Sequence, residues 1–199
     1  ESKKIIKFCK KNSMNSIFTS SKCLTGTDRV AEVAKRLNYK YYINLQGDEP
    51  IFNPEDIKNL INEVKKNPES IVNGYCQIKN NSQYLSINTP KVVISKKNYL
   101  MYISRAPIPT KAFKKNNKAF RQVCIYGYPK NKLLEFKKNN KFPNEKAEDI
   151  EILRFLEMDF SVKMIQLSSQ SIPVDIPSDV KLVEKFLKKQ NAKKIKKFL

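Results

Sequence analysis

The sequence predicts a single α/β domain in which strands and helices alternate along the chain. Short runs of β-branched and aromatic residues recur, as in Tyr41–Gln46. Between these runs lie longer segments whose apolar residues repeat with helical spacing. A length of 199 residues and a hydrophobic content of 40% are enough for one domain, 1–199, with a substantial core.

The first part of the chain is expected to alternate regularly between helices and strands. Its opening segment has helical periodicity through Ile5, Ile6 and Phe8, as though the chain begins inside a helix already under way. Pro54 suits the first turn of a later helix, with Asn53 as its cap. In chain order we expect a helix at 3–11, a strand at 16–20, a helix at 28–37, a strand at 41–46 and a helix from residue 54.

The second part is expected to add a hairpin and then further strands and helices. Lys91–Ile94 and Tyr99–Ile103 are joined by a turn-prone Lys-Lys-Asn segment, which predicts an antiparallel pair. Glu145–Met158 is acidic and amphipathic, which predicts one continuous helix. The other expected elements are strands at 71–78, 122–128 and 162–167, helices at 130–138 and 178–186, a basic loop at 111–118 and a basic tail at 188–199.

The charge balance raises the question of a polyanionic partner. The chain has 39 basic and 19 acidic residues, for a net charge of +20. Such a value suggests nucleic acid or an anionic surface. The lysines, however, are spread through the whole chain, as general lysine-rich usage would produce. A solvated basic surface is therefore favoured and no nucleic-acid partner is expected, with a non-catalytic nucleic-acid-binding protein as the alternative.

The composition excludes several classes of chemistry. The chain has no histidine, so it cannot use an imidazole base, a Ser-His-Asp triad or a histidine-ligated zinc. Its four cysteines form no Cys-x-x-Cys pair, which favours reduced thiols. No apolar run approaches the roughly 20 residues that span a bilayer. We therefore expect a soluble, cytoplasmic protein that does not enter the membrane.

The acids that follow the strand at 41–46 form the first candidate site. Gln46, Gly47, Asp48, Glu49 and Pro50 end this run abruptly. In open α/β sheets ligands bind outside the carboxyl ends of strands, so an acid there can hold a metal or a phosphate-bearing substrate. The alternative is a simple turn whose acids are solvated. Asp48 is the first functional candidate on these grounds.

A series of short motifs resembles one known family over nearly the whole chain. The motifs are Gly26-Thr27-Asp28-Arg29-Val30-Ala31-Glu32, Gln46-Gly47-Asp48-Glu49-Pro50, Ser104-Arg105-Ala106-Pro107-Ile108-Pro109, Ile125-Tyr126-Gly127-Tyr128, Leu153-Arg154 and Val174-Asp175-Ile176-Pro177. Each one alone is weak, but they occur in register. Together they resemble the 3-deoxy-manno-octulosonate cytidylyltransferases, the CMP-Kdo synthetases of bacterial lipopolysaccharide assembly.

This resemblance implies a fold and a reaction. The implied fold is a Rossmann-like nucleotide-diphospho-sugar transferase fold, a mixed and mainly parallel sheet with helices on both faces and a small antiparallel dimerisation subregion at 79–121. The implied reaction joins CTP to 3-deoxy-D-manno-octulosonate (Kdo), giving CMP-Kdo and pyrophosphate. Magnesium and positioning are expected to supply most of the catalysis, because charge builds on phosphate oxygens. The implied assembly is a homodimer.

The resemblance also implies roles for individual residues. Asp48 and Asp175 match the family's metal-binding acids, so we expect them to converge around Mg²⁺ in the catalytic centre, although Asp175 alone is typical of a turn. Arg29 and Arg105 are expected to bind anionic groups of the substrates, with surface charges as the alternative. The remaining implied contacts are Gln46, Gln122, Tyr126 and Glu148 to the sugar, with core or capping roles as their alternatives, and Thr27 and Asp28 to the nucleotide.

Departures from the family pattern leave the acceptor open. The family's N-terminal strand and basic phosphate-binding loop are absent from this sequence, so we expect these 199 residues to be inactive by themselves. Gln122 stands where the family has His, and a neutral amide cannot gain a proton near neutral pH. Ile152 replaces a family Gln in the run Glu151-Ile152-Leu153-Arg154. An 8-amino variant of Kdo or a nonulosonic acid is therefore an alternative acceptor.

Overall fold

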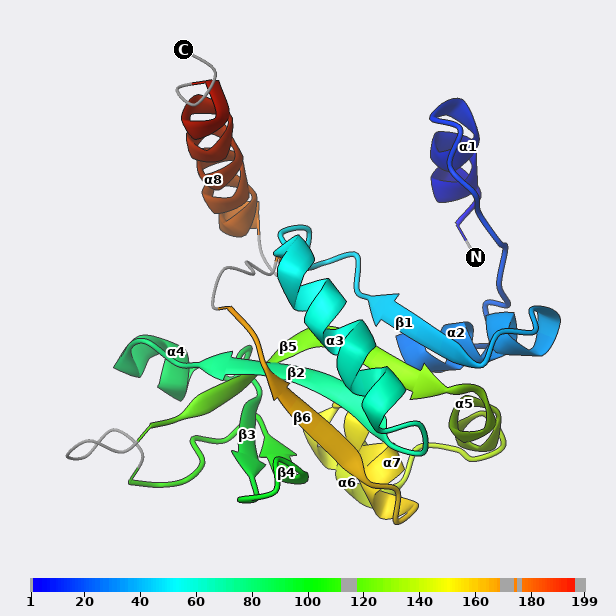
Figure 1. Cartoon of the computed structure of the whole chain (residues 1–199), viewed down its shortest axis with the longest axis vertical. Coiled ribbons are helices and arrows are strands. Elements are labelled where there is room, and N and C mark those ends of the chain that lie inside the picture. The colour runs from blue at the N-terminus through cyan, green and yellow to red at the C-terminus, as the bar shows by residue number, and fades with distance from the viewer. Residues whose placement is uncertain (1, 112–117, 169–173, 175–176, 196–199) are drawn as a thin grey trace.

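A computed structural model describes residues 2–111, 118–168, 174 and 177–195. Within these residues, strands form one mixed sheet of six strands, surrounded by helices (Figure 1). The strands are β1 Tyr41–Leu45, β2 Ile71–Gln77, β3 Lys91–Ile94, β4 Leu100–Ser104, β5 Phe120–Pro129 and β6 Val162–Gln166. The helices are α1 Lys3–Lys11, α2 Gly26–Arg36, α3 Pro54–Lys66, α4 Asn81–Leu85, α5 Lys130–Phe136, α6 Pro143–Glu148, α7 Ile152–Glu157 and α8 Pro177–Ile195.

The long strand β5 organises the sheet, whose order is β4-β3-β5-β2-β6 with β1 also paired to β5. Strand β5 pairs antiparallel with β1, β2 and β3, and β3 pairs antiparallel with β4. Among the described strands only β2 and β6 form a parallel pair. The expectation of a mainly parallel sheet was therefore wrong. Strands β1, β2 and β6 do run in one direction, but the reversed β5 lies between β1 and β2.

Helices cover both faces of this sheet, as expected. Side chains alternate along β5, so Val123 and Ile125 pack toward Leu60 and Val64 of α3. Gly127 belongs to this face, where a Cβ would overlap Val64. The opposite face packs against α2, α5 and α7, and its core includes the buried residues Ala31, Ala34, Tyr126, Tyr128, Leu133, Phe136, Leu153 and Phe155. The two hydrophobic layers hold β5 in the middle of the molecule.

Local capping chemistry places the helices near the site. The Asn53 side chain accepts a hydrogen bond from the Glu55 N–H at 3.1 Å, and Pro54 occupies the first turn of α3. Thr25 caps α2 by accepting from the Asp28 N–H at 3.2 Å. These two caps fix where α2 and α3 begin. Helix α2 begins with the Gly26–Glu32 motif, and α3 begins shortly after the Gln46–Pro50 motif.

Three element predictions need correction. Residues 16–20 form no strand and connect α1 to α2 outside the sheet (Figure 1). The expected helix at 145–158 is broken into α6 and α7 by Asp149, whose φ is 49°. The Arg105 side chain bonds the carbonyls of Glu148 and Asp149, which a continuous helix would have used internally. Helix α8 continues to Ile195, so much of the predicted tail is helical.

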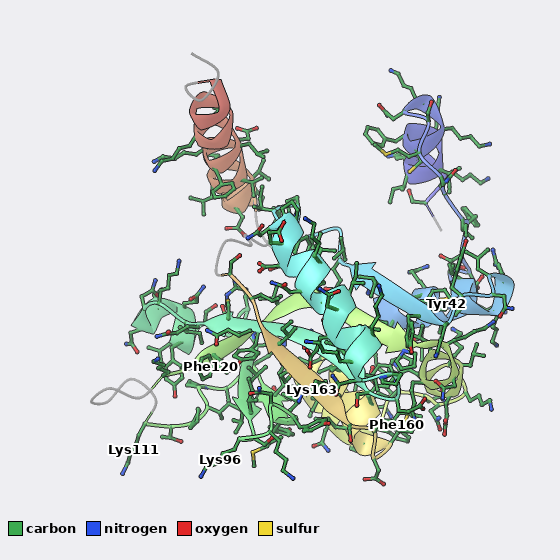
Figure 2. All side chains as sticks on the ribbon, in the orientation of Figure 1. Tyr42, Lys96, Lys111, Phe120, Phe160 and Lys163 are labelled. Carbon is green, nitrogen blue, oxygen red and sulfur yellow. The ribbon has the colours of Figure 1, made fainter. Side chains whose placement is uncertain are left out.

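The surface is basic on several sides of the molecule. Lys96 and Lys111 point outward from the region of β3 and β4 (Figure 2). Helices α1 and α8 stand away from the sheet, and both are rich in lysine (Figure 1). Among the residues that the structure describes, we find no helix with the length and apolar character that crossing a bilayer requires. The distribution of lysines agrees with the expected solvated basic surface.

Candidate active site

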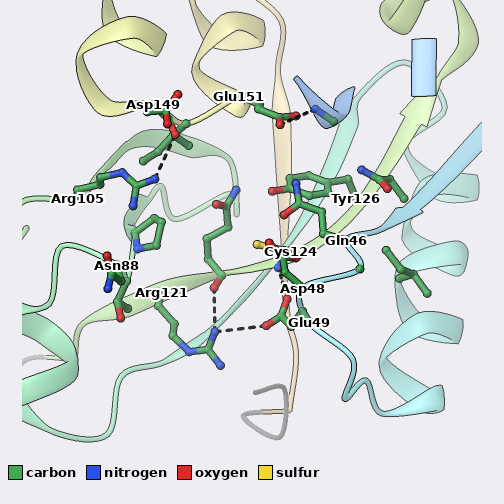
Figure 3. Close-up of a pocket in the computed structure, with 18 of the residues that line it drawn as sticks. Gln46, Asp48, Glu49, Asn88, Arg105, Arg121, Cys124, Tyr126, Asp149 and Glu151 are labelled. Atoms are coloured by element: carbon green, nitrogen blue, oxygen red, sulfur yellow. Dashed lines mark hydrogen bonds and ion pairs between the residues drawn. The ribbon is translucent and has the colours of Figure 1, made fainter. Parts of the chain in front are cut away.

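A pocket of about 850 Å³ opens where β1 ends, beside the middle of β5 (Figure 3). Three arginines line it, Arg29, Arg105 and Arg121. Its acidic lining residues are Asp48, Glu49, Asp149 and Glu151. This size is in the range of small-molecule sites, and the guanidinium groups suit an anionic ligand. The lining residues come from segments that lie far apart in the sequence, from Gly26 to Glu151.

The turn after β1 carries Asp48 and is fastened to β5 by Glu49. Pairing of β1 with β5 ends at Leu45, and the Gln46 N–H still donates to the Cys124 carbonyl at 3.3 Å. The Glu49 carboxylate then accepts from the Cys124 N–H at 2.8 Å, in the place of a strand carbonyl. Glu49 is only 2% exposed. A buried side chain thus extends the pairing of β5 and sets the path of the turn.

Glu49 has a second buried partner in Arg121. The Arg121 Nη1 and a Glu49 carboxylate oxygen are 3.7 Å apart, and both side chains are almost fully buried. Arg121 also donates to the Gln122 carbonyl at 3.1 Å (Figure 3). Desolvation, followed by the charges of Glu49 and Asp48, raises the pKa of the Cys124 thiol to about 12. Cys124 therefore stays protonated at neutral pH and is no nucleophile.

Asp48 itself is exposed at the pocket, next to its buried neighbour Glu49. The Asp48 carbonyl accepts a hydrogen bond from the Val174 N–H at 2.7 Å. Asp175, the second predicted metal ligand, lies outside the described residues. Its immediate neighbour in the chain is nevertheless bonded to the Asp48 backbone. The convergence of Asp48 and Asp175 around a metal ion therefore stays a prediction.

The start of α2 also lines the pocket, and the Glu151 carboxylate is hydrogen-bonded to its first turn. The Glu151 carboxylate accepts from the Gly26 N–H at 2.9 Å and the Thr27 N–H at 2.8 Å (Figure 3). Backbone N–H groups in the first turn of a helix have no partner within the helix, and a carboxylate satisfies them well. Glu151 therefore links the loop between α6 and α7 directly to the start of α2 at the pocket.

Thr27 and Asp28 are buried, in contrast to the nucleotide contacts expected for them. Each is 1% exposed, and neither lines the pocket. The Thr27 hydroxyl donates to Glu151 at 2.5 Å and lies 3.2 Å from the Tyr128 hydroxyl. Asp28 lies 3.4 Å from Arg154, whose guanidinium also binds Glu145 in a bidentate pair at 2.6 and 2.7 Å. Their geometry is that of framework residues, and a nucleotide contact stays a prediction.

Arg105 lines the pocket, but each of its three guanidinium nitrogens donates a hydrogen bond to a backbone carbonyl of the protein. Its Nε donates to the Glu148 carbonyl at 2.7 Å, Nη1 to the Ile87 carbonyl at 3.0 Å and Nη2 to the Asp149 carbonyl at 3.2 Å. Glu148, expected to contact the sugar, does not line the pocket. Its carboxylate accepts from the Ser104 hydroxyl at 2.5 Å and the Arg105 N–H at 2.8 Å. Glu148 thus supports Arg105 from outside the pocket.

The remaining predicted contacts, Arg29, Gln46, Gln122 and Tyr126, all line the pocket. Arg29 donates to the Ser20 carbonyl at 3.0 Å and to the Thr19 hydroxyl at 3.3 Å. Tyr126 is buried and stacks on Tyr128, with ring centroids 5.6 Å apart. Desolvation, together with the nearby Cys124, raises the pKa of Tyr126 well above its usual value. Tyr126 therefore acts as a neutral phenol.

Sequence reasoning missed Glu49, Arg121 and Glu151. All three lie inside or beside runs that the sequence had already singled out, since Glu49 follows Asp48, Arg121 precedes Gln122 and Glu151 begins the run that ends at Arg154. Position in a motif was the available signal. Burial and pairing, which mark these residues as parts of the site, became visible only in three dimensions.

The carboxylates of the site bear on whether it could hold a magnesium ion. No cluster of three or more His, Cys, Asp or Glu side chains suited to a metal occurs in the part of the chain that the structure describes. Magnesium, however, needs only one or two carboxylates, because it keeps several waters and binds substrate phosphates. The exposed Asp48 carboxylate at the pocket is such a donor. The residues present therefore fit the expected ion.

Fold and pocket together define a nucleotidyltransferase-like α/β protein. A family model described as "Cytidylyltransferase" matches residues 1–167. A relative from Thermodesulfovibrio yellowstonii named 3-deoxy-manno-octulosonate cytidylyltransferase is 36% identical over 185 residues, covering 86% of this chain and 72% of the relative. One of the same name from Fusobacterium nucleatum is 33% identical over 179 residues, covering 89% and 73%. The chain belongs to the cytidylyltransferase family, among the 3-deoxy-manno-octulosonate cytidylyltransferases.

Solved structures agree with this assignment. A CMP:2-keto-3-deoxy-manno-octonic acid synthetase complexed with CTP matches with a TM-score of 0.88 and 25% identity, covering 96% of this chain and 79% of that one. HddC from Yersinia pseudotuberculosis matches with a TM-score of 0.67 at 17% identity, covering 94% and 75%. The second likeness concerns the fold alone. The predicted family and its α/β fold are thus confirmed.

Proposed function

We propose that this protein transfers the cytidylyl group of CTP to Kdo, yielding CMP-Kdo and pyrophosphate for lipopolysaccharide synthesis. The observation that carries the proposal is the Asp48 turn, held by buried Glu49 at a pocket lined by three arginines. Both substrates are anionic, one through its triphosphate and the other through its carboxylate. A pocket that combines exposed carboxylates with several guanidinium groups suits a reaction between them.

The reaction is an in-line displacement at the α-phosphorus. The anomeric hydroxyl oxygen of the sugar acid forms a bond to this phosphorus, the bond to the bridging oxygen of the β-phosphate breaks, and the hydroxyl proton is released. The guanidinium groups of Arg29, Arg105 and Arg121 line the pocket and supply positive charge for the anionic groups of both substrates. Such a transfer depends mainly on positioning and on charge stabilisation of the phosphoryl oxygens.

Asp48 and Asp175 are the residues that we propose to hold Mg²⁺. The support is the exposure of Asp48 at the pocket and the hydrogen bond of its carbonyl to Val174, the neighbour of Asp175. A bound Mg²⁺ supplies neutralisation of the charge on the phosphate oxygens. The protein keeps Asp48 in place through its neighbour Glu49, which is buried, pairs with Arg121 and accepts a hydrogen bond from β5.

We also propose a cytoplasmic homodimer. The segment 79–121, expected to form the dimer contact, carries large hydrophobic side chains that are exposed. They are Leu85, Ile87, Met101 and Tyr102. Exposed apolar side chains are the kind that protein interfaces bury. A cytoplasmic location follows from the use of CTP, which is made and kept inside cells, and suits the free cysteines.

Pyrophosphate release tests the proposed reaction. The complete coding sequence that contains these residues is expressed, and release is followed with CTP, MgCl₂ and a panel of Kdo, 8-amino Kdo and a nonulosonic acid. We expect the highest kcat/KM with Kdo, no release without an acceptor and little release when ATP or GTP replaces CTP. A preference for another acid in the panel would reassign the acceptor, and no CTP-dependent release with any acid would refute the transferase.

A further inference from the structure

Strand β2 has an irregularity beside the pocket that a single amide repairs. Its register against β5 shifts between Asn73 and Gly74, so two residues of β5 have no direct partner there. The Asn73 side chain fills the gap. Its Nδ2 donates to the Val123 carbonyl at 3.1 Å and to the Ile125 carbonyl at 2.9 Å. Asn73 is 0% exposed, so these bonds replace lost strand pairing in the core.

The carbonyls of Val123 and Ile125 fix the orientation of the Asn73 side-chain amide. An amide nitrogen carries two N–H donors, and both of those of Asn73 have an acceptor. The carbonyl Oδ1 must then face the other way, where the Gln122 Nε2 donates to it at 3.0 Å. Reversing the Asn73 amide would place a carbonyl oxygen against two others, which is unfavourable. Asn73 can therefore serve Gln122 only as an acceptor.

The orientation of Gln122 follows from that of Asn73. Because Gln122 must offer its Nε2 to Asn73, its carbonyl Oε1 occupies the other branch of the planar amide. Gln122 is 6% exposed and lines the pocket, whereas Asn73 does not reach it. The chain of hydrogen bonds thus runs from the β5 carbonyls through Asn73 to a side chain at the substrate site.

We propose that Asn73 is a positioning residue for acceptor recognition, fixing the Gln122 amide so that Oε1 accepts a hydrogen bond from a hydroxyl group of the sugar acid. This inference rests on the proposed function. Gln122 presents one hydrogen-bond acceptor that remains uncharged at every pH near neutrality. A sugar acid with a donor at this place binds well. One that offers only an acceptor leaves two oxygens facing each other and binds poorly.

Replacing Gln122→Glu tests the orientation with an isosteric change. A carboxylate has no N–H for Asn73 at neutral pH, so two oxygens face each other and the side chain turns away. We expect the KM for Kdo to rise about tenfold, the scale of one hydrogen bond, while the KM for CTP changes by less than about twofold. Gln77→Glu is the matched control, because Gln77 is exposed at the end of the same β2 strand. An unchanged KM for Kdo in Gln122→Glu overturns the proposal.

A double-mutant cycle separates positioning from a general structural role. Asn73→Ser is made in the parent and in Gln122→Ala, and both KM values and kcat are measured. If Asn73 acts through Gln122, Asn73→Ser raises the KM for Kdo in the parent but adds nothing in Gln122→Ala. Equal increases in both backgrounds would mean that Asn73 supports only the sheet, which overturns the proposal.

A readout that needs no turnover keeps the inference distinct from the proposed reaction. In ¹⁵N-labelled protein, the side-chain amide signals of Gln122 are assigned by their loss in Gln122→Ala. We expect Asn73→Ser to shift them upfield and to speed their exchange with water, since the hydrogen bond at Nε2 is lost. Unchanged Gln122 amide signals in Asn73→Ser would overturn the hydrogen bond between Gln122 and Asn73, and with it the proposal. Failure of the parent to release pyrophosphate refutes only the reaction, because the amide signals still report on Asn73.

Discussion

The turn after β1 and the start of α2 share one arrangement, and both contribute residues to the pocket. In the turn, Glu49 is buried and bonded to β5 while its neighbour Asp48 is exposed at the pocket. At the start of α2, Asp28 is buried and paired with Arg154 while its neighbour Arg29 lines the pocket. In each motif one charged residue is buried in the framework and the adjacent one lines the pocket.

The difference between the two regions lies in what holds the buried acid. Glu49 takes the place of a strand partner for the Cys124 N–H and pairs with Arg121, and both of these partners belong to β5. Asp28 belongs to a larger network in which Arg154 also binds Glu145 and packs on the Phe136 ring, 3.8 Å from its centroid. The first region is built to place a functional group, and the second to keep the helices α2, α6 and α7 together.

The largest effect is expected at the exposed acid. Asp48→Asn should lower kcat/KM by at least about 1,000-fold, because the loss removes several kcal/mol of charge stabilisation at the phosphate. The free energy of unfolding should stay unchanged, since Asp48 is exposed. Pyrophosphate release and urea denaturation check the two halves of this expectation. The control is Asp159→Asn, an exposed turn acid outside the pocket lining, and retained activity in Asp48→Asn would contradict the metal assignment.

The network around Arg154 is the place to test the framework. Arg154→Met leaves the buried carboxylates of Glu145 and Asp28 without their main cation, so unfolding should become easier by about 3–5 kcal/mol. Arg36→Met, which breaks a partly exposed pair with Glu32 on α2, should cost less than about 1 kcal/mol. Urea denaturation of both variants gives the comparison. Equal losses would show that burial of this network contributes nothing.

Substitution of Thr27 tests whether this residue contacts the nucleotide or supports the framework. Thr27→Val keeps the shape but removes the hydroxyl that bonds Glu151, so we expect a stability loss of about 1–3 kcal/mol. The KM for CTP should change by less than about twofold, because Thr27 does not line the pocket. The opposite pattern, an unchanged stability with a markedly higher KM for CTP, would restore the nucleotide contact expected from the sequence.

The smallest effect concerns the thiol of Cys124, which lines the pocket beside the buried Glu49. The pKa of Cys124 is raised to about 12 from 9.0, so the folded state binds its proton more tightly than the unfolded state. Its contribution to stability is complete below pH 9 and is lost as the pH rises toward 12. Wild type and Cys124→Ser are compared by urea denaturation at pH 7 and pH 10. The advantage of wild type should shrink at pH 10, and a constant difference would contradict the raised pKa.

Much of the fold was predictable because it depends on local patterns. Short runs rich in β-branched and aromatic residues predicted β2, β5 and β6, and Asn53 with Pro54 predicted the start of α3. The break at Asp149 was not predictable, since Arg105 takes the carbonyls there from more than forty residues away. The reversed β5 between β1 and β2 was missed for a similar reason, because strand direction depends on neighbours that local periodicity does not reveal.

The sequence by itself determined which segments carry the chemistry and to which family they belong, because motif residues and their order are local and countable. Only the tertiary structure decided the role of each member, such as Asp48 at the pocket, Asp28 in the interior and Asn73 behind Gln122. The physical reason is burial. A charged or amide side chain changes from ligand contact to framework according to the distant groups that surround it, and these become neighbours only when the chain folds.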